Sequence, residues 1–224
     1  MKTAPKLLVF TLVEFVMFGS MLFVPAGTFH YWQAWVFLVV VAIPAWIPSI
    51  YLLRRNPAAL EARMRGGPAA EGRMAQKVVI GVLYLSLAAM VVVSAFDHRF
   101  AWSAVPTAIC LVGDVLVGAG LGVVALVIIQ NSYAAATVQV QTGQQVVSTG
   151  LYGLVRHPMY TGNVIMMVGI PLALGSYWGL AFVVPGLIVL ASRIRDEETL
   201  LQKELDGYRE YTRRVRHRLV PGMW

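Results

Sequence analysis

Charged residues are scarce in this chain, and their scarcity excludes most soluble folds. Only 13% of the 224 residues are Asp, Glu, Lys or Arg, whereas soluble domains carry about 25%. Hydrophobic residues make up 58% of the chain, and the mean hydropathy is +0.68. Several apolar runs are long enough to cross a hydrocarbon layer of about 30 Å. The composition therefore predicts an integral membrane protein.

Cysteine is nearly absent, which excludes covalent cross-linking and cysteine metal centres. Cys110 is the only cysteine, so the chain cannot form an internal disulfide. It lies inside an apolar run, where a buried thiol is inert. The sequence also has no His, Cys, Asp or Glu group with metal-ligand spacing and no glycine-rich phosphate loop. We therefore expect a functional site without a metal ion.

Six apolar segments of helical length set the expected fold. They span 7–25, 31–53, 78–96, 104–129, 159–174 and 177–191. The last two are short and meet at Gly175-Ser176, which favours a helical hairpin that crosses the bilayer fully or only in part. We predict an all-α integral membrane protein with five to six transmembrane segments and an amphipathic C-terminal tail. Residues 1–129 would form a four-helix membrane region, and residues 130–224 a loop, the hairpin and the tail.

Basic residues are unevenly distributed, and this asymmetry predicts the orientation. Lys and Arg near the ends of membrane segments are enriched on the cytoplasmic side. With both termini in the cytoplasm, only Arg99 lies outside. Lys2 and Lys6 precede an apolar run, as in a signal peptide, but a second run follows at once, so we interpret the first as a retained helix. We expect a multi-pass protein of a bacterial inner membrane.

The net charge of +7 and the pI near 9.8 indicate attraction to anionic lipid headgroups rather than to nucleic acid. Many of the basic residues lie in the loop of 54–77. This loop is predicted to begin with a short helix after Pro57 and to end at Gly66-Gly67-Pro68. Its basic residues most simply face headgroups; the alternative is that part of the loop covers the functional site.

Two polar stretches flank the last hairpin. Residues 130–158 predict an extended, turn-rich loop, and such a loop between two membrane segments is uncommon unless it is functional. In the tail, apolar residues recur at helical spacing: Leu200, Leu201, Leu205, Tyr208, Tyr211 and Val215. Gly207 is expected to divide the tail into two short helices, and Pro221 to end it.

The stretch Arg156-His157-Pro158-Met159-Tyr160-Thr161-Gly162 lies where a polar segment becomes apolar. A helix is predicted to begin at Pro158, because proline suits the first turn and disfavours helix before it. The N-terminus of such a helix favours negative charge, and the planar guanidinium of Arg156 suits a carboxylate. Gly162 permits close approach of backbone or ligand. The alternative is that Arg156 and His157 are ordinary interfacial residues.

Glu197 and Glu198 directly follow the last apolar segment. Because the hairpin returns to the same membrane surface, we expect them near Arg156, in a layout suited to a charged, soluble cofactor at the lipid edge. Adjacent helical residues point about 100° apart, so the two carboxylates are not expected to share a proton. One could pair with Arg156 or bind a ligand, and the other could be solvated. Alternatively, both are acidic partners of a helix N-terminus.

Glu14 and Asp114 lie inside predicted membrane segments, where acids are costly and are candidate functional residues by default. No Lys or Arg lies at a matching depth, so Ser, Thr or Tyr neighbours would have to satisfy them. Asp114 falls toward the outer half of its segment. We interpret both acids as structural polar contacts rather than as catalytic groups.

The motifs of the C-terminal part resemble those of one family. They are Gly150-Leu151-Tyr152, Arg156 to Gly162, Asp196-Glu197-Glu198-Thr199-Leu200, Gly207-Tyr208-Arg209-Glu210-Tyr211 and Arg218-Leu219-Val220-Pro221. In this order they resemble the isoprenylcysteine carboxyl methyltransferase family, part of a wider group of membrane methyltransferases that includes phospholipid N-methyltransferases. The resemblance covers about residues 130–224 and includes Asn131-Ser132-Tyr133. Leu151 and Gly153 depart from it, because many relatives have Pro and Arg there.

The resemblance implies an S-adenosylmethionine-dependent methyltransferase with its catalytic region in residues 130–224. Its cofactor pocket would face the cytosol, and a lipophilic acceptor would arrive from the bilayer. The implied cofactor contacts are His157, Tyr160, Gly162 and Glu197, and the implied catalytic residues are Arg156 and Glu198. The acceptor stays open among a prenylcysteine-like carboxylate, a phospholipid amine and a thiol. A carboxylate is already ionised at neutral pH, whereas an amine or thiol would need a base such as His157 or a Glu.

Two other functions are compatible with the sequence. Membrane sterol reductases have a related C-terminal architecture and use NADPH, whose 2′-phosphate could be held by the basic loop of 54–77. A non-enzymatic membrane protein or small transporter would instead predict polar residues along a path across the bilayer. The deep polar positions of this chain are few and scattered, which favours the enzymes.

Overall fold

The computed structural model describes residues 3–64, 74–131 and 143–224, and this part of the chain is helical without strands. The helices are α1 (Thr3–Ala26), α2 (Trp32–Arg55), α3 (Pro57–Met64), α4 (Met74–Phe100), α5 (Thr107–Gln130), η2 (Gly150–Gly153), α6 (Pro158–Ala173), η3 (Trp178–Phe182), α7 (Val183–Glu204) and α8 (Tyr208–Arg214). Five helical stretches, in α1, α2, α4, α5 and η3–α7, are long and apolar enough to cross a membrane. The predicted all-α integral membrane fold is confirmed.

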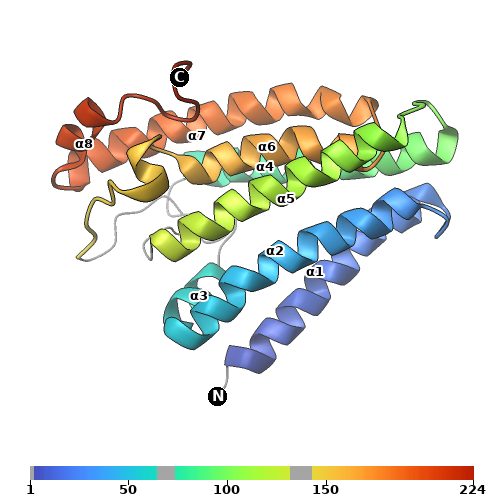
Figure 1. Ribbon diagram of the computed structural model, residues 1–224, viewed down its shortest axis with the longest axis horizontal. Coiled ribbons are helices and arrows are strands. Elements are labelled where there is room, and N and C mark those ends of the chain that lie inside the picture. The colour runs from blue at the N-terminus through green and yellow to red at the C-terminus, as the bar shows by residue number, and fades with distance from the viewer. Residues whose placement is uncertain (1–2, 65–73, 132–142) are drawn as a thin grey trace.

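The helices form two layers (Figure 1). An antiparallel pair, α1 and α2, packs against a group made of α4, α5, α6 and α7. The core between the layers includes Leu22, Phe37, Met90, Val117 and Leu174. Outward-facing side chains such as Leu8, Val115 and Ile188 are about two-thirds exposed. An apolar surface of this extent suits a bilayer, where lipid tails cover it.

Small residues bring α5 and α6 together along their length. A Cβ on Gly120 would lie 2.6 Å from the carbonyl oxygen of Gly162, and a Cβ on Gly162 would lie 2.6 Å from that of Gly120. Gly113 and Gly169 make similar backbone contacts across the same helix pair. Glycine permits this approach because it has no side chain, as in other packed membrane helices. The start of α6 is thereby held beside the end of α5.

In the last hairpin, α6 is as short as predicted, whereas α7 is longer than predicted. The 16 residues of α6 rise about 24 Å, less than a hydrocarbon layer of about 30 Å. The chain turns at Gly175, whose φ is +72°, and then continues through η3 into α7. Because α7 runs to Glu204 rather than ending near residue 191, the alternative that Glu197 and Glu198 flank a helix N-terminus is wrong.

The tail and the loops agree in part with the sequence-based predictions. Gly207, with φ of +80°, is the N-cap of α8, so the predicted break at Gly207 is confirmed. The tail residues before it belong to the long helix α7 rather than to a separate short helix, and α8 ends at Arg214 rather than at Pro221. The short helix after Pro57 is confirmed as α3, whereas Gly66-Gly67-Pro68 lies outside the described residues. Of the polar loop, residues 132–142 also lie outside them. Residues 143–149 form turns and irregular backbone, as predicted, and η2 follows.

One of the two intramembrane acids, Asp114, does not find the polar neighbours that we expected among the described residues. Asp114 is 6% exposed, and neither of its carboxylate oxygens has a hydrogen-bond partner among the described residues. Glu14 lines an apolar cavity between α1, α2 and α5. Thr11 lines the same cavity, and its hydroxyl donates to the carbonyl oxygen of Leu7. The prediction of hydrogen-bonded structural contacts is therefore wrong for Asp114.

We call the end of the bundle where α2, α5 and α7 finish and α4 and α6 start the basic end; it lies on the left in Figure 1. We expect this end to face the cytoplasm. In a Cys110→Ala background, a membrane-impermeant maleimide added to intact cells should label Trp102→Cys. It should label Lys203→Cys only after permeabilisation, because Lys203 lies near the end of α7 at the basic end. Both side chains are exposed, so the opposite labelling pattern would rule out this orientation.

Candidate functional site

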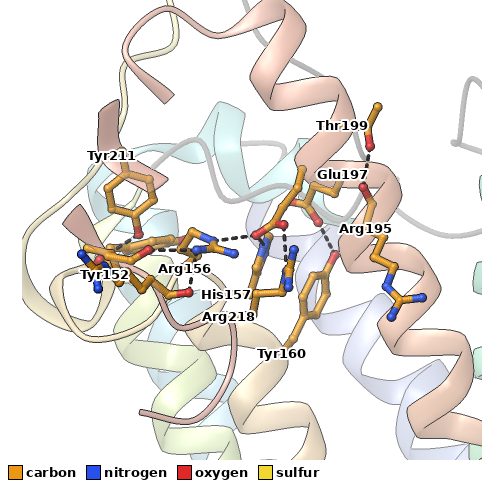
Figure 2. Close-up of polar contacts among 12 residues, drawn as sticks. Tyr152, Arg156, His157, Tyr160, Arg195, Glu197, Thr199, Tyr211 and Arg218 are labelled. Atoms are coloured by element: carbon orange, nitrogen blue, oxygen red, sulfur yellow. Dashed lines mark hydrogen bonds and ion pairs between the residues drawn. The ribbon is translucent and has the colours of Figure 1, made fainter. Parts of the chain in front are cut away.

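The candidate site lies at the basic end, where the start of α6 meets α7 and the C-terminal tail (Figure 2). As predicted, α6 begins at Pro158, in its first turn. Proline suits this position because it has no N–H to leave unpaired. His157 is the N-cap, yet its side chain makes no capping bond. Its imidazole points to α7 instead.

The C-terminal tail returns alongside the residues that precede α6. The backbone N–H groups of Arg156 and His157 donate to the carbonyl oxygens of His217 and Arg218, each at 2.9 Å. The Thr161 hydroxyl donates to the carbonyl oxygen of Leu219 at 2.8 Å. These bonds satisfy backbone groups on both segments and bring the side chain of Arg218 into the site.

The Glu198 carboxylate is the centre of the first polar network. Its Oε1 accepts from Arg156 Nε at 2.6 Å and contacts His157 Nε2 at 3.2 Å. Its Oε2 accepts from Arg218 Nε at 2.8 Å. Arg156, His157 and Glu198 are each less than a tenth exposed. Burial excludes water, so these charge-assisted contacts are stronger than the same pairs at a surface.

Arg156 also holds the tail with its second donor group. Its terminal nitrogen donates to the carbonyl oxygens of Val215 and Arg216 at 2.9 and 2.8 Å. A guanidinium can do this because its donors form a fixed planar fork. Arg156 therefore joins α7, the tail and the start of α6, which is more than the interfacial role considered as the alternative.

Glu197 belongs to a second network on the neighbouring face of α7. Its Oε2 accepts from the Tyr160 hydroxyl at 2.7 Å. Arg193 Nε donates to the same hydroxyl oxygen at 3.0 Å, and its terminal nitrogen donates to Gln76 Oε1 at 2.6 Å. The Gln76 amide in turn donates to Asp196. Glu197 and Glu198 thus have separate partners, as their helical spacing predicts.

The rings of His157 and Tyr160 connect the two networks. They are stacked, with their centroids 5.6 Å apart. The site gathers three guanidinium groups and three carboxylates: Arg156, Arg193, Arg218, Asp196, Glu197 and Glu198. Guanidinium forks match carboxylates, and carboxylates accept from ammonium groups and hydroxyls. The arrangement can therefore bind a polar ligand that carries both signs of charge. Among the described residues, no three His, Cys, Asp or Glu side chains are grouped to hold a metal ion.

The structure brings five of the six residues singled out from the sequence into contact: Arg156, His157, Tyr160, Glu197 and Glu198. Gly162 lies one turn further along α6, against the backbone of α5. Its side-chain position is filled by the neighbouring helix, so packing alone accounts for glycine there. A role of Gly162 at a cofactor stays a prediction.

Sequence reasoning missed four residues of the site: Asp196, Arg193, Gln76 and Arg218. Arg193 is 3% exposed and Gln76 is 1% exposed, and both connect α7 to α4. The signal for Arg193 was present, because a charged residue next to an apolar membrane run is a functional candidate. Gln76 had no signal of its own. Arg218 was one basic residue among many in the tail, and only the return of the tail distinguishes it.

The part of the chain that contains most of these contacts is similar to a known protein family. Residues 108–206 match the phospholipid methyltransferase family. The match covers less than half of the chain and includes α5, α6 and α7. It supports the wider group of membrane methyltransferases. Both polar networks have their α6 and α7 residues inside the matched region, whereas Gln76 and Arg218 lie outside it.

Two curated relatives are named as sterol reductases rather than as methyltransferases. The chain is 35% identical over 88 residues to the Delta(14)-sterol reductase of Mus musculus, which is 38% of this chain and 21% of that protein. It is 32% identical over 83 residues to the probable 7-dehydrocholesterol reductase of Acanthamoeba polyphaga mimivirus, which is 36% of this chain and 19% of that protein. The chain thus spans about a fifth of the length of these relatives.

Proposed function

We propose that this protein is an S-adenosylmethionine-dependent methyltransferase that acts on a lipophilic acceptor. One observation carries the proposal. Arg156, His157 and Tyr160 from α6 meet Glu197 and Glu198 from α7 in one polar site, inside the region that matches a methyltransferase family. The isoprenylcysteine carboxyl methyltransferase family is the finer assignment that we propose within that group.

The residues of the site fit the proposed cofactor. S-adenosylmethionine has a carboxylate and an ammonium group at its amino-acid end, and the site has guanidinium forks for the first and carboxylates for the second. When bound, it supplies the methyl group on its sulfonium. His157, Tyr160 and Glu197 are proposed to contact it. Gly162 is proposed to let it approach the start of α6.

Arg156 and Glu198 are proposed to lie nearest the transferred group, and the structure suggests different tasks for them. Both oxygens of Glu198 already accept bonds from cationic or imidazole groups, so Glu198 is suited to hold Arg156 and His157 in place. Arg156 is suited to orient an acceptor carboxylate. Positioning of this kind is the main contribution an enzyme can make to an in-line displacement. For an amine or thiol acceptor, the candidate base is His157 or a Glu.

An apolar cavity suggests how the acceptor reaches the site. It has a volume of about 440 Å³ and lies between α1, α2 and α5. Its walls include Phe10, Glu14, Phe18, Val41, Trp46 and Val124. Leu52, Leu60 and Ile128 line its end near α3, and Met159 of α6 packs against these three residues. A lipid tail in the cavity would therefore end next to the residue that precedes Tyr160.

The sterol reductase names of the two relatives favour a second candidate function, an NADPH-dependent membrane reductase. The surplus of basic residues around α7 and the tail would suit the phosphates of NADPH. The two cofactors would use different groups, the polar site for S-adenosylmethionine and the basic residues for the phosphates of NADPH, so cofactor binding separates the two functions.

The expected result is that S-adenosylhomocysteine binds the detergent-solubilised protein with micromolar affinity or weaker, and NADPH does not. At a hundredfold excess over the dissociation constant, binding adds about 2.7 kcal/mol of stability. For a protein of this size the thermal midpoint should rise by roughly 5 °C or more. Titration calorimetry gives the affinity directly. A shift with NADPH alone would favour the reductase, and no shift with either ligand would refute both cofactors.

The acceptor is sought with the same preparation. Incubation with a membrane lipid extract and methyl-labelled S-adenosylmethionine should place label in the organic phase, because the acceptor is proposed to come from the bilayer. A His157→Ala preparation serves as the control for non-enzymatic methylation. Label confined to water-soluble products would contradict a lipophilic acceptor.

A further inference from the structure

Tyr208 has a buried hydroxyl without a hydrogen-bond partner in the described part of the chain. The residue is 4% exposed, so bulk water does not replace the missing partner. Buried hydroxyls in folded proteins are normally paired. An unpaired one next to a functional site therefore calls for an explanation in terms of what binds there.

Tyr211, three residues further along α8, is also buried, but its hydroxyl has a hydrogen-bond partner. It is 2% exposed, and its hydroxyl donates to the carbonyl oxygen of Tyr152 at 2.8 Å. The two rings pack together with centroids 5.7 Å apart, in a small core with Val215, Leu201 and Leu205. The fold thus provides a backbone acceptor for one hydroxyl of the pair and leaves the other without a partner among the described residues.

The Tyr208 hydroxyl lies within the electrostatic influence of the candidate site. Burial raises its pKa, the charges of Glu198 and Glu197 raise it further, and Arg156 opposes them. The phenol therefore keeps its proton at neutral pH and remains a donor. Gly207, in a left-handed conformation with φ of +80°, fixes the start of α8 and with it the placement of Tyr208.

We propose that the Tyr208 hydroxyl binds the amino-acid end of the cofactor by donating a hydrogen bond to its carboxylate. The proposal rests on the proposed function. The adenine and ribose are uncharged, whereas the amino-acid end carries a carboxylate and an ammonium group. The charges of Arg156, Glu197 and Glu198 all act on the Tyr208 hydroxyl, and charges of both signs suit that pair. Tyr208 is then a residue that selects a nucleoside with a charged amino-acid extension.

The test compares Tyr208→Phe with Tyr211→Phe. Each substitution removes one hydroxyl and keeps the ring, so packing in the small core is preserved. Tyr208→Phe should weaken S-adenosylhomocysteine binding roughly tenfold to a hundredfold, because a bond to a charged ligand group is lost. Its thermal midpoint without ligand should be unchanged or higher, since the lost hydroxyl has no hydrogen-bond partner in the part of the chain that the structure describes. Tyr211→Phe should show the reverse, with a lower midpoint and unchanged affinity.

A second ligand locates the contact. Decarboxylated S-adenosylhomocysteine keeps the adenosine, the sulfur and the amine but lacks the carboxylate. Calorimetric titration should show that its affinity is the same for the original protein and for Tyr208→Phe. An equal loss of affinity for both ligands would overturn the proposal, because it would point to pocket shape rather than to the carboxylate.

The remaining outcomes separate this inference from the function on which it rests. If the original protein binds S-adenosylhomocysteine and Tyr208→Phe binds it equally well, the role of Tyr208 is refuted and the methyltransferase remains. If the original protein does not bind S-adenosylhomocysteine, the proposed function fails, and the role of Tyr208 fails with it.

Discussion

Replacing Glu198 by Gln is expected to lower the thermal midpoint by roughly 10 °C, because removing one partner of a buried ion pair typically costs about 3–5 kcal/mol. The substitution keeps the shape of the side chain and removes its charge. Arg156, which is 8% exposed, then faces an uncharged amide that also brings hydrogen-bond donors toward it. Arg218 contributes less to the loss, because its side chain is 31% exposed and is partly screened by solvent.

Lys6→Gln is the matched control for Glu198→Gln. It breaks the pair that Lys6 Nζ forms with Glu61 at 3.3 Å, in which the Lys6 side chain is 57% exposed. Exposed pairs contribute less than about 1 kcal/mol, so the midpoint should shift by a few degrees at most. Thermal unfolding of the detergent-solubilised variants measures both effects. Equal shifts for the two variants would show that the Glu198 network does not hold the site together.

The second large effect is expected from His157→Ala and Glu197→Gln. Each removes a proposed contact to a polar ligand, and losing a hydrogen bond to a charged group weakens binding roughly tenfold to a hundredfold. Glu197 is only half-buried and its removal leaves Tyr160 bonded to Arg193, so the fold should survive. Gel filtration tests monodispersity, calorimetry measures cofactor affinity, and labelled transfer measures activity.

Asp114→Asn is the control for these two variants. Asp114 is buried in α5, a helix whose other end reaches the site, and its oxygens have no hydrogen-bond partner among the described residues. The change removes a charge from the membrane interior and should leave most of the methyl transfer intact. Abolished transfer in Asp114→Asn together with normal transfer in His157→Ala would place the chemistry deeper in the bundle than we propose.

Periodicity and hydropathy were sufficient for the helices that cross the bundle, because length and apolar character are local properties of a membrane segment. The start of α6 at Pro158 was equally local, since proline restricts its own φ and the residue before it. The end of α7 could not be predicted from the neighbouring sequence in this way. The charged stretch after Leu190 suggested that the apolar segment stops, but the helix continues to Glu204 because Arg193, Asp196 and Glu198 find polar partners on other segments.

Glu198 shows the limit of sequence reasoning for the site. Its proximity to Arg156 followed from the hairpin, which returns the chain to one membrane surface. Its contact with Arg218 depends on the tail folding back along the start of α6. No pattern of residue spacing in the sequence predicts that the tail folds back in this way. Gly162 shows the same limit. Close packing against Gly120 on α5 accounts for glycine at this position, and the sequence does not indicate that these two residues meet.

The sequence by itself determined the all-helical membrane class, the helix start at Pro158 and the meeting of the Arg156 and Glu197-Glu198 segments at one end of the bundle. These follow from hydropathy, backbone restriction and the geometry of a hairpin, all of which act over short distances along the chain. Only the tertiary structure decided which carboxylate pairs with which cation, that Gln76 and Arg193 connect α4 to the site, and that the Tyr208 hydroxyl has no partner among the described residues. The physical reason is that buried polar groups choose partners by distance and direction in space, and residues far apart in sequence supply those partners.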